Sequence, residues 1–207
     1  MGKAYKDIML VGLTGQTGAG KTVAGQFFAD KGFGVINCDL VSRKVVSDGS
    51  DCLDRIVEEF SDKILNPDGT LNRQKLAMIV FTNNQKLIKL NEIIHPYICE
   101  KIFGVVDILI ENGFKTIVLD APTLFESGLD KKCDIIISVI APEDDRVYRI
   151  VKRDNIKEDM AQARVTAQLD EKFYRAASDY VIDNNQSLKD YKIKLEEVYS
   201  FIKNFKV

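Results

Sequence analysis

A glycine-rich segment near the start of the chain has the residue types that bind phosphate groups. It reads Gly-Gln-Thr-Gly-Ala-Gly-Lys-Thr over residues 15–22 and fits the pattern G-x-x-x-x-G-K-[ST]. Glycines let successive backbone N–H groups turn toward an anion, and a helix that starts there adds partial positive charge. Lys21 would reach the β- and γ-phosphates of a nucleotide, and the Thr22 hydroxyl would bind Mg²⁺. The residues that we expect to bind the nucleotide are Gly15, Thr17, Gly18, Ala19, Gly20, Lys21 and Thr22.

A flexible turn at a strand end is the alternative interpretation of this segment. The apolar run Ile8–Leu13 precedes it directly and the helical stretch Thr22–Asp30 follows it, which is the context of a phosphate-binding loop. The sequence contains no Asn-Lys-x-Asp, the motif that a GTPase would need to recognise guanine. The length of 207 residues and the helical stretches outside the strands favour a small ATP-dependent kinase.

Two carboxylates follow predicted strands and are candidates for the chemistry of phosphoryl transfer. Asp39 ends the segment Val35–Asp39, and Asp120 ends Thr116–Asp120. The carboxyl ends of parallel strands line the ligand crevice of an α/β fold, so both acids are expected there. Asp39 would accept the proton of an attacking hydroxyl, and Asp120 would bind Mg²⁺ directly or through water. The alternatives are the N-cap of a helix over Leu40–Val46 for Asp39 and a strand-end cap for Asp120.

Arg149 and Arg153 are four residues apart in a predicted helix that begins near Pro142, so they lie on one helix face. As catalytic residues, they would stabilise the negative charge that spreads over the phosphates in the transition state. The alternative is a solvated charged face, because residues 143–145 are acidic and would pair with the arginines.

Five short apolar runs without helical spacing predict the strands that position these residues. They are Ile8–Leu13, Phe33–Cys38, Thr116–Leu119, Ile135–Ile140 and Tyr180–Ile182. Most are followed by segments with helical periodicity, which favours a parallel sheet covered on both faces. The predicted fold class is α/β: a P-loop NTPase core with a parallel β-sheet flanked by helices, plus a helical insertion and a helical lid. The core would comprise about residues 1–40, 114–153 and 178–207.

Residues 41–113 interrupt the alternation of strands and helices and are predicted to be the helical insertion. Pro96 is expected to kink a helix there or to begin a new one. His95 lies in an apolar helical stretch, where a core or capping histidine is more common than a functional one. The polar stretch 154–177 is predicted to be the lid, and Leu188–Phe205 a closing amphipathic helix.

The composition excludes several other classes of protein. The chain has 29 basic and 31 acidic residues, so no excess of positive charge favours binding to nucleic acid. Its four cysteines form no C-x-x-C and there is one histidine, which argues against a zinc site or a disulfide framework. The longest apolar run, residues 135–141, is far shorter than the ~20 residues of a membrane span. We expect a cytoplasmic protein without nucleic-acid or membrane partners.

Taken in order, the motifs resemble those of the dephospho-CoA kinase family. The matching segments are residues 12–24, 35–39 with Arg43, 68–73, His95-Pro96, 119–126, Arg149, Arg153-Asp154, Arg164, Gln168 and 177–184. The resemblance implies that the γ-phosphoryl group of ATP is transferred to the ribose 3′-hydroxyl of dephospho-CoA, the last step of coenzyme A synthesis. It also implies a CoA-binding role for the insertion 41–113 and a lid.

The resemblance further implies roles for individual residues. Asp39 corresponds to the family's proposed base. The residues implied to bind the acceptor are Asp39, Arg43, Arg73, His95, Pro122 and Leu124. Three positions depart from the family's usual residues: Asn37 stands in place of Asp, Ala19 in place of Ser and Thr123 in place of Leu.

Two other functions are compatible with the glycine-rich loop. One is a nucleoside or nucleotide kinase of similar build with a smaller acceptor. The other is a regulatory ATP-binding module without turnover, for which Asp39 and the arginines would be incidental. The acceptor that raises ADP production separates the three possibilities.

Overall fold

The computed structural model describes residues 5, 7–47 and 49–205. The outermost parts of the predicted core, residues 1–4, 6 and 206–207, lie outside the described residues. The chain divides into two compact units. The core unit contains the described residues up to Asn37 and from Leu109 onward, and the helical unit is Cys38–Ile108.

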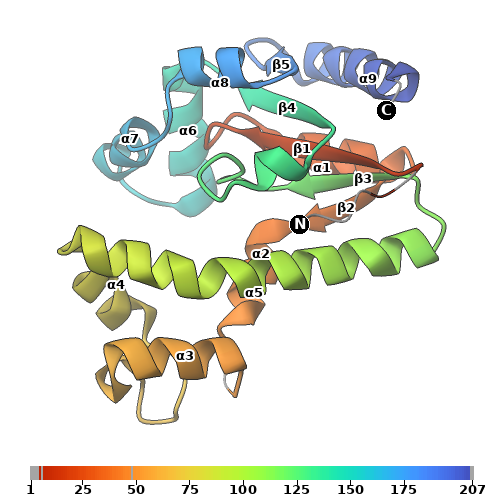
Figure 1. Ribbon diagram of the computed structural model, residues 1–207. Coiled ribbons are helices and arrows are strands. Elements are labelled where there is room, and N and C mark those ends of the chain that lie inside the picture. Colours follow the sequence, from red (N-terminus) through yellow and green to blue (C-terminus); the bar gives the residue numbers. More distant parts are fainter. Residues whose placement is uncertain (1–4, 6, 48, 206–207) are drawn as a thin grey trace. The chain divides into compact units, whose positions relative to one another are not determined.

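The core unit is built on five parallel strands in the order β2–β3–β1–β4–β5 (Figure 1). The strands are β1 Met9–Gly15, β2 Gly34–Asn37, β3 Thr116–Asp120, β4 Ile135–Ile140 and β5 Tyr180–Asp183. Each strand overlaps the apolar run that predicted it, and the α/β fold class is confirmed. β1 is the central strand, so the glycine-rich loop that follows it starts at the middle of the sheet's carboxyl edge.

Helices α1 (Lys21–Asp30) and α9 (Leu188–Asn204) contribute to the apolar core on one face of this sheet. Alternate residues of β1 and β4 point into the same core. Phe28 of α1 and Leu195 of α9 have no exposed surface there. The buried stripe of α9 therefore explains its amphipathic pattern, and the predicted closing helix is confirmed.

Three helices connect β4 with β5: α6 Glu143–Asp154, α7 Glu158–Thr166 and α8 Glu171–Ala177. The first two share a small apolar cluster that includes Ile150 of α6 and Ala161 of α7. The stretch predicted as the lid, residues 154–177, thus contains two separate helices, α7 and α8.

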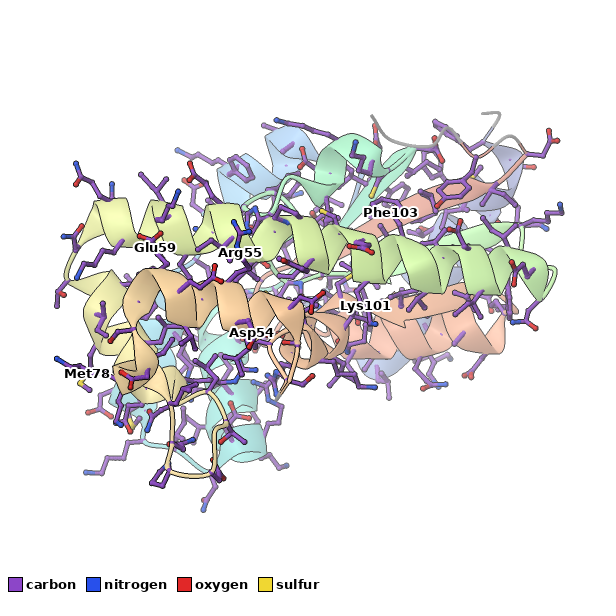
Figure 2. All side chains as sticks on the ribbon, turned by 60° about the horizontal axis from the view of Figure 1, so that its bottom comes forward. Asp54, Arg55, Glu59, Met78, Lys101 and Phe103 are labelled. Atoms are coloured by element: carbon purple, nitrogen blue, oxygen red, sulfur yellow. The ribbon has the colours of Figure 1, made fainter. Side chains whose placement is uncertain are left out.

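The helical unit contains α2 Cys38–Val45, α3 Asp51–Phe60, α4 Arg73–Phe81 and most of α5, Asn84–Glu111. Short 3₁₀ turns cover Asp62–Ile64 here and Leu129–Lys132 in the core unit. Apolar side chains from all four helices form the core of the unit. On α3, for example, Ile56 is buried, whereas Asp54, Arg55 and Glu59 are exposed on its polar face (Figure 2).

The structure decides between alternatives at two positions of the helical unit. Helix α5 continues through Pro96, so no new helix begins there, and the alternative of a kink at Pro96 stays a prediction. Ile94 before the proline and Ile98 after it pack into the same core, which keeps the helix continuous although one N–H donor is missing. Helix α2 begins at Cys38, so Asp39 lies inside its first turn and does not cap a helix over Leu40–Val46.

Across residues 5, 7–47 and 49–205, no helix is long and apolar enough to cross a membrane.

Candidate active site

The start of the P-loop, residues 15–22, is fixed to the neighbouring strand β4. The Gln16 backbone N–H donates to the Val139 carbonyl oxygen at 3.0 Å, and the Gln16 Oε1 accepts from the Ala141 N–H at 3.3 Å. Gly15 leaves β1 with φ of +138°, and a Cβ at this position would lie 2.1 Å from the Val139 carbonyl oxygen. Only glycine fits this junction, and the loop leaves the sheet in a direction that β4 determines.

The end of the P-loop is the N-terminus of α1. Gly20 precedes the helix with φ of +108°, and α1 begins at Lys21. Because the first N–H groups of a helix have no partner within it, those of Gly20, Lys21 and Thr22 are available to an anion. Together with the helix dipole they form the kind of site that binds phosphate.

Lys21 and Asp120 form an ion pair beside this anion site. Asp120 is the last residue of β3, and the strand register places it next to Leu13 of β1. The side chains are largely buried, with 15% of Lys21 and 9% of Asp120 exposed. A Cβ on Gly25 of α1 would lie 3.4 Å from the second carboxylate oxygen, Oδ2. Asp120 therefore engages the P-loop lysine, which disfavours the alternative of a simple strand-end cap.

Arg149 of α6 reaches the P-loop. Its Nη1 donates to the Gly18 carbonyl oxygen at 3.3 Å, and its Nη2 donates to the Asn184 carbonyl oxygen at 3.4 Å. Asp145 lies 3.6 Å from the same guanidinium and balances part of its charge. This placement supports the predicted association of Arg149 with the nucleotide.

Arg153, one turn further along α6, is held by its neighbour Asp154. Its Nε and Nη2 donate to the two carboxylate oxygens at 2.7 and 2.9 Å, and Arg164 of α7 donates to the same carboxylate at 2.6 Å. The hydrogen bond from Arg153 lowers the pKa of Asp154, so this carboxylate stays charged at neutral pH. Of the two predicted arginines, Arg149 contacts the P-loop, whereas Arg153 pairs with Asp154 in a cluster that also contains Arg164.

The segment between α7 and α8 also contacts the P-loop. The Oε1 of Gln168 accepts a hydrogen bond from the Thr17 backbone N–H at 2.6 Å. Gln168 belongs to the predicted lid, residues 154–177, and to the positions that match the family. A side chain of the predicted lid thus accepts a hydrogen bond from one N–H group of the predicted nucleotide site.

The loop that follows β3 carries two of the residues expected to bind the acceptor. The Pro122 carbonyl oxygen accepts from the Thr14 hydroxyl at 3.3 Å. Leu124 is fully buried, and a Cβ on Gly12 of β1 would lie 2.7 Å from its Cδ2. The structure therefore gives Leu124 a packing role against β1, and a direct contact with substrate stays a prediction.

In the helical unit, three of the expected acceptor residues lie together. Asp39 and Arg43 form an exposed ion pair of 2.9 Å on α2, and Arg73 of α4 donates to the Arg43 carbonyl oxygen at 3.1 Å. His95 is half-buried on α5. This unit therefore presents a carboxylate and two guanidinium groups from neighbouring helix termini.

Two residues that were not among the predicted site residues also contact the P-loop. The Asn184 Nδ2 donates to the Ala19 carbonyl oxygen at 2.7 Å, and the Tyr191 hydroxyl donates to the Gly20 carbonyl oxygen at 3.1 Å. Asn184 falls in the segment 177–184 that resembles the family, so the sequence already indicated that this segment belongs to the family's motifs. Nothing in the local sequence distinguishes Tyr191 from the other apolar positions of α9.

The arrangement in the core unit defines a class of protein. The central strand of a parallel sheet leads into an anion site, and the lysine of that site pairs with an acid at the end of the adjacent strand. These are the features of a P-loop kinase. A family model for dephospho-CoA kinase matches residues 9–190. The chain belongs to the dephospho-CoA kinase family.

Individual proteins and solved structures are similar to this chain over most of its length. A dephospho-CoA kinase of Fusobacterium nucleatum is 39% identical over 191 residues, which cover 92% of this chain and 96% of that protein. A solved structure from Thermus thermophilus superposes with a TM-score of 0.79 at 25% identity, covering 93% of this chain and 97% of that one. The solved dephospho-CoA kinase of Campylobacter jejuni has a TM-score of 0.68 at 27% identity, with coverage of 93% and 96%.

Proposed function

We propose that the chain transfers the γ-phosphoryl group of ATP to the ribose 3′-hydroxyl of dephospho-CoA and releases coenzyme A and ADP in the cytoplasm. Membership of the dephospho-CoA kinase family over residues 9–190 supports the identity of the acceptor. The single structural observation that carries the proposal is the ion pair of Lys21 with Asp120 at the N-terminus of α1. This ion pair supports the proposal because a P-loop kinase uses a lysine cation and a strand-end carboxylate beside the bound phosphates.

The P-loop binds the triphosphate through backbone N–H groups and Lys21. Lys21 adds a mobile positive charge, which leaves Asp120 and turns to the β- and γ-phosphates when the nucleotide enters. Arg149, anchored on the P-loop, and Arg153, released from Asp154, stabilise the charge of the transition state.

The residues present fit a magnesium ion that accompanies the nucleotide. The described part of the chain contains no group of three or more His, Cys, Asp or Glu that could hold a metal ion by itself. Mg²⁺ suits such a site, because it uses one or two protein oxygens together with substrate phosphates and water. The Thr22 hydroxyl and the Asp120 carboxylate would hold it. Bound there, it would neutralise charge on the β- and γ-phosphate oxygens.

Asp39 acts as the base in this proposal. Its carboxylate accepts the proton of the 3′-hydroxyl while the hydroxyl oxygen bonds to the γ-phosphorus and the bond from that phosphorus to the β,γ-bridging oxygen breaks. The acceptor is bound by Arg43, Arg73, His95, Pro122 and Leu124. Guanidinium groups suit this task because the acceptor carries a diphosphate.

The lid, residues 154–177, closes over the bound nucleotide and excludes water, which prevents wasteful hydrolysis of ATP. The hydrogen bond from Thr17 to Gln168 supports this proposal, since it joins the lid directly to the P-loop.

The experiment compares acceptors in the presence of Mg·ATP and measures ADP and phosphorylated product. Dephospho-CoA should raise ADP production, and the product should be coenzyme A. Lys21→Ala should abolish this turnover without unfolding the chain, whereas the exposed Lys203→Ala serves as the matched control and should leave it unchanged. Turnover with AMP or nucleosides instead would indicate a nucleotide kinase, and turnover with none of them a binding module.

A further inference from the structure

Two side chains far away in the sequence hold consecutive carbonyl groups of the P-loop. Asn184 Nδ2 donates to the Ala19 oxygen at 2.7 Å, and the Tyr191 hydroxyl donates to the Gly20 oxygen at 3.1 Å. Only 8% of Asn184 and 2% of Tyr191 are exposed. We propose that Asn184 and Tyr191 are positioning residues of the nucleotide site, which aim two P-loop N–H groups at the phosphates of ATP. The proposal rests on the nucleotide binding described under the proposed function.

The geometry of the peptide bond connects these contacts to the anion site. In a trans peptide the C=O and the N–H of one planar unit point in opposite directions. The Ala19 carbonyl shares its unit with the Gly20 N–H, and the Gly20 carbonyl shares its unit with the Lys21 N–H. Because side chains of the protein bind both carbonyl oxygens, the two N–H groups point the opposite way, toward the anion site at the start of α1.

Asn184 is itself held firmly at the end of β5. Its backbone N–H donates to the Ile140 carbonyl oxygen at 2.8 Å, and its carbonyl oxygen accepts from Arg149. Its amide also explains the glycine at position 20, where a Cβ would lie 2.6 Å from Nδ2. The amide is therefore packed directly against the loop that it supports.

Tyr191 is held by the first turn of α9. Its backbone N–H donates to the Ser187 carbonyl oxygen at 3.0 Å, within a capping box that Ser187 forms with Asp190. Burial raises the pKa of the Tyr191 phenol, and the nearby Arg149 only partly opposes this rise. The phenol thus stays protonated at neutral pH and remains a hydrogen-bond donor.

Loss of the Asn184 amide frees the peptide unit of Ala19 and Gly20. That unit can then rotate and turn its carbonyl oxygen, which repels phosphate, toward the nucleotide. The Gly20 carbonyl still accepts from the N–H groups of Val23 and Ala24 at 3.0 and 3.3 Å, so loss of the Tyr191 hydroxyl loosens the next unit less. A missing hydrogen bond of this kind corresponds to about 5- to 100-fold weaker binding of ATP. The acceptor makes no contact with these two peptide units in the proposed function, so its affinity should change far less.

The test compares four variants by calorimetric titration with ATP and, separately, with dephospho-CoA. Tyr191→Phe removes one hydroxyl, and Asn184→Asp replaces the donor amide by a carboxylate of nearly the same shape. Tyr199→Phe on the same helix and Asn204→Asp at its exposed end are the matched controls. We expect the dissociation constant for ATP to rise by about 5- to 100-fold in Asn184→Asp and by about 2- to 5-fold in Tyr191→Phe. Both controls should keep the wild-type affinity for ATP, and the affinity for dephospho-CoA should change by less than about twofold in all four variants.

An unchanged affinity for ATP in Tyr191→Phe and Asn184→Asp would overturn the proposal. An equal loss of affinity for both ligands, accompanied by a lower melting temperature, would also overturn it, because the two residues would then only stabilise the fold. The readout is independent of phosphoryl transfer. A further outcome is that the wild-type chain phosphorylates no dephospho-CoA while Tyr191→Phe and Asn184→Asp still bind ATP more weakly than the wild-type chain does. In that case the proposed function fails and the positioning role stands.

Discussion

Replacing Asp39 by Asn separates a catalytic carboxylate from a merely structural one. The substitution preserves the shape of the side chain and removes its charge. Asp39 lies in the first turn of α2 and pairs with Arg43 at 2.9 Å, with 50% of the Asp39 side chain and 66% of the Arg43 side chain exposed. An exposed pair of this spacing contributes ~0.3–0.5 kcal/mol, and the interaction with the helix dipole about 0.3–1 kcal/mol.

The expected loss of stability is therefore small. The two contributions together amount to at most about 1.5 kcal/mol, which corresponds to roughly 3–6 °C in melting temperature for a chain of this size. Loss of a general base, by contrast, lowers the rate by about 10²–10⁴, or roughly 2.7–5.5 kcal/mol in activation free energy. The catalytic role predicts that kcat falls far more than stability does.

The assay measures kcat with dephospho-CoA, the affinity for ATP and the melting temperature of the same preparation. Asp51→Asn is the matched control, because Asp51 is an exposed acid in the first turn of α3 in the same unit. Asp39→Asn should lose most of its turnover and keep its ATP affinity, and Asp51→Asn should keep both. A kcat of Asp39→Asn within about threefold of the wild-type value, well below the loss expected for a base, would refute the assignment.

Two further predictions concern the P-loop and the lid. Gly15→Ala should destabilise the chain by several kcal/mol and abolish ATP binding, because the new Cβ would lie 2.1 Å from the Val139 carbonyl oxygen. Gly104→Ala, which has open space around it on α5, should leave the melting temperature unchanged or raise it, and a folded, ATP-binding Gly15→Ala would contradict the geometry. Hydrogen exchange across residues 154–177 should slow when ATP and dephospho-CoA are added together, and unchanged protection there would remove the lid from the proposal.

The strands and the P-loop were predictable because their signals are local. β4 coincides with its apolar run Ile135–Ile140, and the motif over residues 15–22 carries its own strand–loop–helix context. The position of Asp39 was predicted less well. Aspartate is favoured both as an N-cap and within the first turn of a helix, so residue type alone does not distinguish these positions. The structure resolves the choice because α2 begins directly after β2.

The family resemblance included Gln168 and Asn184, but their contacts with the P-loop could not be derived from local patterns, because these contacts are long-range. Gln168 and Asn184 meet loop residues that are 151 and 165 positions earlier in the chain. Tyr191 is a buried residue of an amphipathic helix, and its pattern predicts burial without revealing that its hydroxyl reaches Gly20. Long-range contacts of this kind depend on the packing of the whole sheet, which no local pattern specifies.

The central position of β1 has a consequence for the synthesis of the protein. β1 and the P-loop leave the ribosome early, but β1 pairs with β3 and β4, and the loop needs Asn184 and Tyr191 as well. At about 5–20 residues per second, roughly 10–30 s separate the translation of Lys21 from that of Tyr191. Helix α1 follows the loop directly, but β1 lacks first β3 and then β4 during this interval, and helix α9 is translated after both strands. The apolar β1 therefore waits for its complete core until the end of this interval. We expect ATP to stabilise only the finished core and to give no help to the nascent one, because a ligand stabilises only the state that it binds.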